Sequence, residues 1–237
     1  MVFSGLYRAL PALALLLIPT PVAADGPRVV ELFSSVVCKY CPAAEAAFET
    51  YLKKRPDVIA LNCFVKVVNL GGDTISRPAC SVRQRQFANT LRNGSIATPM
   101  YALNGREMIP HVRTEYEAFM QASLRDNGDV TPLRIFPAMS PDAPTQVSLP
   151  SLPRLAENGK YGVWLVTTRK PFTARILRQK ERRFTHVVRD MQKLTDWDGY
   201  RRTLSLRVTP AADTDKMIIL VDDPAGRIAA AGQVTWR

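Results

Sequence analysis

The sequence predicts an α/β domain over residues 25–128 followed by a β-rich, sandwich-like module over residues 129–237. Three observations indicate this class. Strand-like and helix-like segments alternate up to residue 127, and two cysteines in Cys-x-x-Cys spacing separate the first strand from the first helix. From residue 130 short strand-like segments recur between proline-rich turns, which is typical of all-β architectures.

The first strand and the first helix are built around the two cysteines. Val29–Phe33 is an apolar run rich in β-branched residues, which predicts a buried strand. Cys38 and Cys41 follow, and Pro42 opens an Ala/Glu-rich segment that we expect to be helical to about Lys54. Strand, loop, Cys-x-x-Cys and helix together are the arrangement of a thioredoxin-like redox site.

The remaining elements of the α/β part complete a β-α-β-α-β-β-α order, which is the thioredoxin order. The Asn104-Gly105 pair predicts a tight hairpin between two of the strands. The expected strands are Val58–Val68, Ile96–Leu103 and Glu107–Pro110, and the expected helices are Cys80–Asn93 and Glu115–Arg125.

For the C-terminal part the sequence predicts a series of strands and one helical segment, Val187–Leu194. The expected strands are Val130–Phe136, Gln146–Leu149, Tyr161–Thr168, Thr173–Ile176, Thr203–Val208, Met217–Val221 and Ile228–Thr235.

Residues 1–24 predict a secretory signal peptide that is cleaved before Asp25. Arg8 supplies a positive charge, Leu10–Ile18 is apolar, and Val22-Ala23-Ala24 supplies the small residues of a cleavage site. An uncleaved anchor helix is the alternative, but the apolar run is short against the ~20 residues that a span needs. We therefore expect a periplasmic or secreted protein, where disulfides persist.

The chain is basic, with a formal net charge of +11. An exported basic protein suggests acidic partners or an anionic envelope surface, although a merely solvated basic surface is the plainer interpretation. Nucleic acid is disfavoured because the charges are dispersed and aromatic residues are not interleaved with them. The sequence does not indicate an oligomeric state.

Cys38 and Cys41 are the candidate catalytic residues. A thiolate is the nucleophile of thiol–disulfide exchange, and a helix N-terminus lowers the pKa of a cysteine placed there. We expect Cys38, which precedes the helix, to attack, and Cys41, inside the first turn, to resolve. Lys39 adds a weak positive influence. The alternative is a permanent structural disulfide.

Thr98-Pro99 is the candidate substrate-binding element. In thioredoxin-like proteins a cis-proline before a strand packs against the Cys-x-x-Cys, and the backbone of the preceding residue pairs with a bound polypeptide. We expect Thr98-Pro99 to be that cis step. An ordinary trans-proline at a strand edge is the alternative.

Cys63 and Cys80 leave several interpretations open. They could form a second disulfide around the 69–79 loop, stay as two buried thiols, or relay electrons to the first pair. A four-cysteine zinc site is disfavoured because these two lack paired spacing. We predict no metal and no cofactor.

Other polar residues carry weaker signals. His111 and His186 are isolated, and each is more typical of a surface or capping histidine than of a ligand. Asp73 could lie near the Cys-x-x-Cys. Glu31 stands among apolar neighbours, where it could shuttle protons to the resolving thiol or simply be satisfied by a partner.

The combined motifs resemble exported bacterial thioredoxin-like proteins of domain-of-unknown-function family 1223. The resemblance covers essentially the whole chain after residue 28 and implies a thioredoxin fold with a β-rich module packed on it, but no substrate. The matching residues are Val29–Ser35, Cys38-x-x-Cys41-Pro42-x-Ala44, Arg55–Val58, Arg83–Arg85, Thr98–Met100, Asn104-Gly105, Arg183-x-x-His186-x-Val188-Arg189 and Trp197–Gly199.

One segment departs from the family pattern. Where relatives usually carry a His-Val-Asp-Tyr-Trp-Asp type of segment, this chain has Phe64–Asn69, so the expected polar and aromatic rim is lost. Cys63 lies beside this segment, and Cys80 stands where relatives tend to have an aromatic residue. The resemblance thus supports pairing of Cys63 with Cys80.

The leading hypothesis is an exported thiol–disulfide oxidoreductase that acts on protein cysteines through a mixed disulfide. The competing hypothesis is a non-catalytic envelope-binding module, or a copper-handling protein, in which the Cys-x-x-Cys disulfide is structural. Thiolates suit Cu(I), but no Met or His motif lies nearby.

Overall fold

The structure, a computed structural model, describes residues 26–67, 71–91, 94–110, 130–140, 143–155, 159–176 and 180–236. The predicted signal peptide, the predicted helix at 115–125 and His111 lie outside these residues. Neither helix of the described part is long and apolar enough to cross a membrane.

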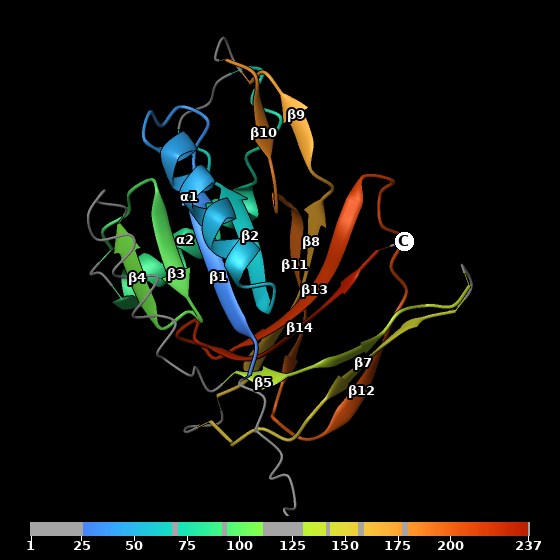
Figure 1. Cartoon of the computed structure of the whole chain (residues 1–237). Helices are drawn as coiled ribbons and strands as arrows, with labels where there is room; N and C mark the ends of the chain where they lie inside the picture. Colours follow the sequence, from blue (N-terminus) through green and yellow to red (C-terminus); the bar gives the residue numbers. More distant parts are fainter. Residues whose placement is uncertain are drawn as a thin grey trace, which may run out of the picture.

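The N-terminal half forms a four-stranded sheet with one helix on each face (Figure 1). The strand order is β2-β1-β3-β4, with β1 parallel to β2 and antiparallel to β3. Alternate residues of β1 point to opposite faces, as the pleat requires, so Val30 and Leu32 pack with α1 whereas Val29 and Phe33 pack with α2. The elements are β1 (Arg28–Ser34), α1 (Cys41–Lys54), β2 (Val58–Phe64), α2 (Pro78–Leu91), β3 (Met100–Leu103) and β4 (Glu107–Pro110).

The C-terminal half consists of three further sheets in the described part of the chain. A five-stranded sheet has the order β11-β8-β13-β14-β5, a three-stranded sheet has the order β12-β7-β6, and β9 pairs with β10. The strands are β5 (Thr131–Pro132), β6 (Arg134–Phe136), β7 (Thr145–Leu149), β8 (Tyr161–Arg169), β9 (Phe172–Ala174), β10 (Arg182–Phe184), β11 (Val188–Trp197), β12 (Arg202–Leu206), β13 (Thr214–Asp222) and β14 (Ile228–Thr235).

The predicted fold class, an α/β thioredoxin-like domain followed by a β-rich module, is wrong. Of the described residues, 44% lie in strands and 16% in two helices, and the strands are divided among several small sheets. The physical reason lies in α2. Arg83, Phe87 and Ala88 form the buried face of α2 against β1, and the same helix also packs on β11 of the C-terminal half, so the helix layer is shared between the two halves instead of closing a separate α/β domain.

One continuous core therefore joins the two halves of the chain. It contains Val29 and Phe33 of β1 together with Met191 of β11 and Ile218 of β13. The central strand β13 is buried on both faces, because its alternate residues, such as Ile219, enter a separate core against the three-stranded sheet. The domain boundary at residues 128/129 stays a prediction, because a shared core does not say whether either part folds alone.

The predicted helix at Val187–Leu194 is also wrong, since Val188–Leu194 belong to β11 and Val187 forms an isolated bridge. This ten-residue strand pairs antiparallel with β8 along its length, and two register shifts interrupt the pairing. The shifts break the strict alternation that would have indicated a strand. Pairing with a long buried neighbour decides the conformation, because β-propensity depends on cross-strand packing.

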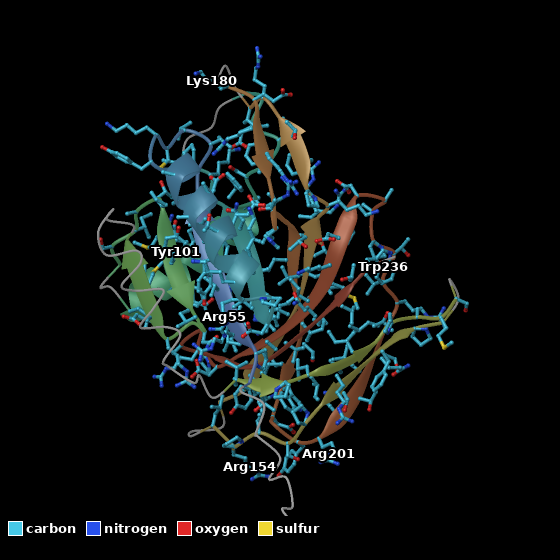
Figure 2. All side chains as sticks on the ribbon, in the orientation of Figure 1. Arg55, Tyr101, Arg154, Lys180, Arg201 and Trp236 are labelled. Carbon is cyan, nitrogen blue, oxygen red and sulfur yellow. A yellow bond between two sulfur atoms is a disulfide. The ribbon has the colours of Figure 1, made fainter. Side chains whose placement is uncertain are left out.

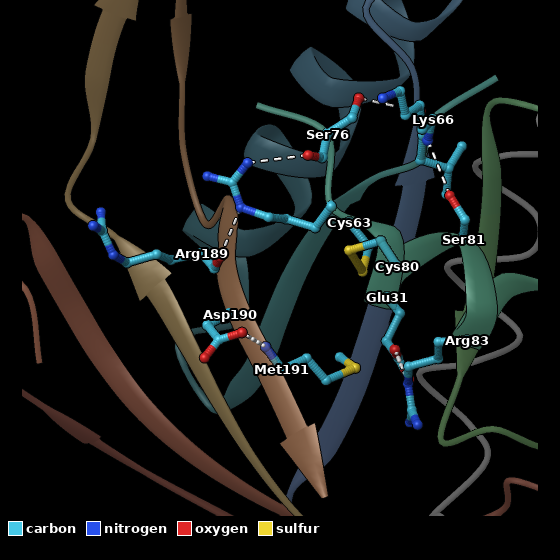
Figure 3. The surroundings of a disulfide bond; sticks show 12 residues. Glu31, Cys63, Lys66, Ser76, Cys80, Ser81, Arg83, Arg189, Asp190 and Met191 are labelled. Carbon is cyan, nitrogen blue, oxygen red and sulfur yellow. Dashed lines mark hydrogen bonds and ion pairs between the residues drawn. A yellow bond between two sulfur atoms is a disulfide. The ribbon is translucent and has the colours of Figure 1, made fainter. Parts of the chain in front are cut away.

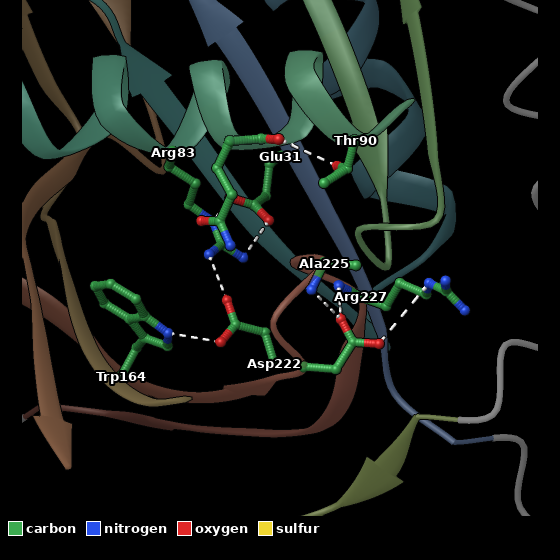
Figure 4. A network of polar contacts seen from close by, with 9 residues as sticks. Glu31, Arg83, Thr90, Trp164, Asp222, Ala225 and Arg227 are labelled. Atoms are coloured by element: carbon green, nitrogen blue, oxygen red, sulfur yellow. Dashed lines mark hydrogen bonds and ion pairs between the residues drawn. The ribbon is translucent and has the colours of Figure 1, made fainter. Parts of the chain in front are cut away.

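A buried ion network fixes α2 between the two sheets (Figure 4). The guanidinium of Arg83 binds both carboxylate oxygens of Glu31 on β1, at 2.5 and 2.9 Å, and Nη1 lies 3.1 Å from a carboxylate oxygen of Asp222 on β13. The indole N–H of Trp164 donates to the other oxygen of Asp222 at 2.8 Å. Burial alone would lower the pKa of Arg83, but the two carboxylates raise it above its usual value. Arg83 therefore stays charged and holds three elements together.

Replacing Arg83 with methionine should destabilise the protein by about 3–5 kcal/mol, because Glu31 and Asp222 would remain buried without their cation. The measurement is the free energy of unfolding in urea at pH 7. Arg85→Met on the same helix is the matched control, since Arg85 is exposed and should change stability by less than about 0.5 kcal/mol. Equal losses for the two variants would contradict the role of the network.

The edge strand β2 is joined to the C-terminal half through the main chain. The N–H of Asn62 donates to the carbonyl of His186 at 2.8 Å, and Asn62 forms an isolated parallel bridge with Val187. His186 has a positive φ of 55°, and its Nδ1 is buried without a hydrogen-bond partner in the described structure. Burial, with a smaller effect of Lys216, lowers the pKa of His186 to about 4.

His186 should make the protein lose stability in mild acid. The unfolded chain takes up a proton near pH 6.5 and the folded chain only near pH 4, so the contribution of His186 is present above pH 6.5 and declines through this window. Asparagine tolerates positive φ and does not titrate, so His186→Asn should flatten the slope by up to about 1.4 kcal/mol per pH unit. Urea unfolding between pH 7 and pH 4 measures this, and parallel profiles would refute it.

Candidate functional site

The Cys-x-x-Cys pair lies in the loop from β1 to α1 and is closed as a disulfide with a Cα–Cα distance of 5.4 Å. The loop is a tight turn, in which the N–H of Cys38 donates to the carbonyl of Ser35 at 3.2 Å. Cys41 is the first residue of α1 and is fully buried, whereas Cys38 is partly exposed. The two sulfur atoms therefore differ in access to a partner molecule, in the order that the sequence predicts.

The Thr98–Pro99 peptide bond is cis, as expected. It precedes β3, and because β3 pairs with β1 it is carried to the end of the sheet where the cysteines lie. Cys38 Sγ lies 3.3 Å from the carbonyl oxygen of Thr98. In the disulfide this is a contact without a proton, but a reduced Cys38 thiol at this place could donate to that carbonyl.

The surface around Cys38 is apolar and carries one cation. Val37, Tyr40 and Ile96 are exposed to 39%, 60% and 48%, although large apolar side chains are usually covered. Lys39 lies over the ring of Tyr40, with Nζ 4.8 Å from its centroid. In contrast, Phe64 is buried. It begins the segment that differs from the family pattern, and it adds no polar group to the surface around Cys38.

A second group of residues beside the cysteines was not predicted. The hydroxyl of Ser34, at the end of β1, donates to Glu45 Oε1 at 2.5 Å, and Glu45 Oε2 lies 3.0 Å from a guanidinium nitrogen of Arg182 on β10. Burial raises the pKa of Glu45, although Arg182 and the Ser34 hydroxyl favour its charged form and limit the rise. A largely buried carboxyl group with a raised pKa is thus held on α1 one turn after Cys41.

The sequence holds a signal for only one of these residues. Glu45 is four positions after Cys41 in a predicted helix, so the two side chains share a helix face. Arg182 is 137 residues from Glu45 in the sequence. It reaches the site only because the β9–β10 pair lies beside the N-terminal end of α1 (Figure 1), which no local pattern indicates.

The second cysteine pair also forms a disulfide, between Cys63 on β2 and Cys80 in the first turn of α2 (Figure 3). Both residues are fully buried in the core that contains Met191 of β11. The bond closes the loop that contains Ile75, and Ile75 packs with Val36 in a smaller cluster. Among the alternatives left open by the sequence, the structure contains the disulfide, and its burial supports a structural rather than a relay role.

Removing the second disulfide with Cys63→Ala/Cys80→Ala should cost about 3 kcal/mol, since it closes a loop spanning 17 residues. The free energy of unfolding under non-reducing conditions is the measurement. The matched control is Cys38→Ala/Cys41→Ala, for which the same relation gives about 2 kcal/mol because the closed loop is much shorter. An unchanged free energy of unfolding in Cys63→Ala/Cys80→Ala would contradict a stabilising role of the Cys63–Cys80 bond.

The other candidate residues do not join the site. Glu31 lies on the α2 face of β1, where Arg83 binds it, so it is the satisfied carboxylate and not the proton shuttle. Asp73 accepts hydrogen bonds from the N–H groups of Ile75 and Ser76 and so shapes its own loop. Within the described residues there is no cluster of three or more His, Cys, Asp or Glu that could hold a metal ion.

The protein is thus a β-rich protein with two disulfides. One is a Cys-x-x-Cys bridge at a helix N-terminus next to a cis-proline, and the other is buried in the core. The chain belongs to the DUF1223 family, described as "Protein of unknown function (DUF1223)", whose model matches residues 29–222. The resemblance drawn from the sequence is thereby confirmed at the level of the family.

A solved structure supports the same architecture. The chain is similar to the crystal structure of protein AGR_C_4864 from Agrobacterium tumefaciens, with 25% sequence identity and a TM-score of 0.68. The match covers 90% of this chain and 95% of that one. No curated protein matches the chain.

Proposed function

We propose that the protein is an exported thiol–disulfide oxidoreductase that acts on cysteines of other proteins through Cys38 and Cys41. The unequal exposure of the two sulfur atoms at one helix N-terminus carries this proposal. A permanent structural bridge has no need to present one of its sulfurs on an apolar surface, beside the backbone carbonyl of Thr98.

The reaction follows from the geometry when the pair is reduced. The Cys38 thiolate attacks one sulfur of a substrate disulfide, a Cys38–substrate bond forms, and the released substrate sulfur takes a proton. The Cys41 thiolate then attacks Cys38, which frees the second substrate thiol and closes the Cys38–Cys41 bond. The same steps in reverse transfer the disulfide to a dithiol substrate.

The environment supplies the features that such exchange needs. The N-terminus of α1 favours the thiolate of a cysteine placed there, and its unpaired N–H groups add to this effect. Val37, Tyr40 and Ile96 offer apolar contact to a polypeptide, and the main chain at Thr98 offers it a hydrogen-bond partner. Export through residues 1–24 would place both disulfides in an oxidising compartment.

Trapping of the mixed disulfide tests the proposal. Cys41→Ser should accumulate covalent complexes with a peptide disulfide through Cys38, because the resolving thiol is missing. Cys38→Ser, the matched control with the same change at the other sulfur, should accumulate few, since Cys41 is buried. Non-reducing gels and intact-mass measurement of the adducts give the readout.

Two results would overturn the proposal in favour of a binding or copper-handling module with a structural bridge. One is the absence of adducts with either variant. The other is a reduction potential of the Cys38–Cys41 pair below about −300 mV, which is typical of structural disulfides.

A further inference from the structure

The β9–β10 pair forms a basic surface, which we call the cationic hairpin. Its exposed cations are Arg175, Lys180 and Arg183, and none of the three forms an ion pair within the described structure. Over the described residues 172–176 and 180–184 the hairpin has only one acidic residue, Glu181. Charges that are not used internally are available to a partner.

The cationic hairpin is fixed beside the Cys-x-x-Cys. Arg182 of β10 is bound to Glu45 of α1 at 3.0 Å, with both side chains largely buried. Phe184 and Ile176 pack in one cluster with Val36, which lies two residues before Cys38. Figures 1 and 2 show the hairpin, with Lys180 at its tip, at the same end of the molecule as the start of α1.

The two loops next to Cys38 Sγ carry no negative charge, and Asp73, in the loop whose Ile75 packs with Val36, accepts hydrogen bonds from its own main chain. Residues 34–41 and 94–99, which provide the two loops next to Cys38 Sγ, contain no Asp or Glu, and they contain one cation, Lys39. Glu45 is largely buried and already paired with Arg182. A polypeptide that reaches Cys38 therefore meets an apolar patch that carries Lys39, with the cationic hairpin at the same end of the molecule (Figure 2).

We propose that the protein selects acidic polypeptide substrates, in which Asp and Glu flank the reacting cysteine and contact the cationic hairpin. This inference rests on the proposed oxidoreductase function and names its substrate class. Opposite charges steer the encounter and raise the association rate 10- to 10³-fold at low ionic strength, and salt screens the effect.

The test uses two peptide disulfides that differ only in their flanking residues, one pair acidic and the other basic. The rate of exchange with the reduced full-length protein is measured at low and at high salt. The wild type should react at least about tenfold faster with the acidic peptide at low salt, and the ratio should approach one near 1 M salt.

Charge reversal locates the effect. Arg175→Glu/Lys180→Glu/Arg183→Glu should abolish the preference for the acidic peptide. The matched control, Arg154→Glu/Arg201→Glu/Arg202→Glu, makes the same change in net charge at exposed positions, of which Arg154 and Arg201 lie at the opposite end of the molecule (Figure 2). It should keep the wild-type ratio within about twofold, because the interaction between charges weakens with distance.

The outcomes distinguish failure of the oxidoreductase function from failure of acidic substrate selection. If neither peptide exchanges, the oxidoreductase function fails. If both exchange equally fast, or if the control loses the preference as fully as the hairpin variant, the oxidoreductase function stands and acidic selection by the cationic hairpin is overturned. Membrane binding is measured by sedimentation with vesicles of anionic lipid. If the wild type shows no peptide preference but binds the vesicles, and only the hairpin variant loses this binding, the surface binds a membrane instead.

Discussion

The packing of the N-terminal sheet on the C-terminal sheet depends on one buried cation. Arg83 lies between Glu31 of the four-stranded sheet and Asp222 of the five-stranded sheet, so it joins the two sheets on which the buried face of α2 packs. Burial raises the pKa of Asp222 and the charge of Arg83 only partly offsets this, so the network is costly to assemble. Loss of any one of its charged members would leave the others buried without compensation, so the three residues act as a unit.

The sequence predicted the features that are encoded within a few residues. The strand before the Cys-x-x-Cys, the helix that begins at Cys41, the cis Thr98–Pro99 step and the Asn104-Gly105 turn depend on local composition and spacing, and the structure contains each of them. The fold class was wrong because the contacts of α2 with β11 and with Asp222 of β13 join distant parts of the sequence. Helix periodicity predicts which face is buried but does not show which strands pack on it.

The candidate site was predictable to the same extent. Cys38, Cys41, Thr98 and Pro99 come from motifs, and the structure brings them together. The Ser34–Glu45–Arg182 group depends on β10 packing against the start of α1. Its cation, Arg182, is 137 residues from Glu45 in the sequence, so no local pattern predicts the pair.

The contact between Asn62 and His186 has a consequence for how other polypeptides can approach. An edge strand with free N–H and C=O groups is a template for adding another strand, by which many proteins bind peptides or aggregate. Here the outer edge of β2 is occupied at Asn62 by the chain that enters β11. Strand addition along β2 is obstructed, which protects the folded protein from self-association through that edge.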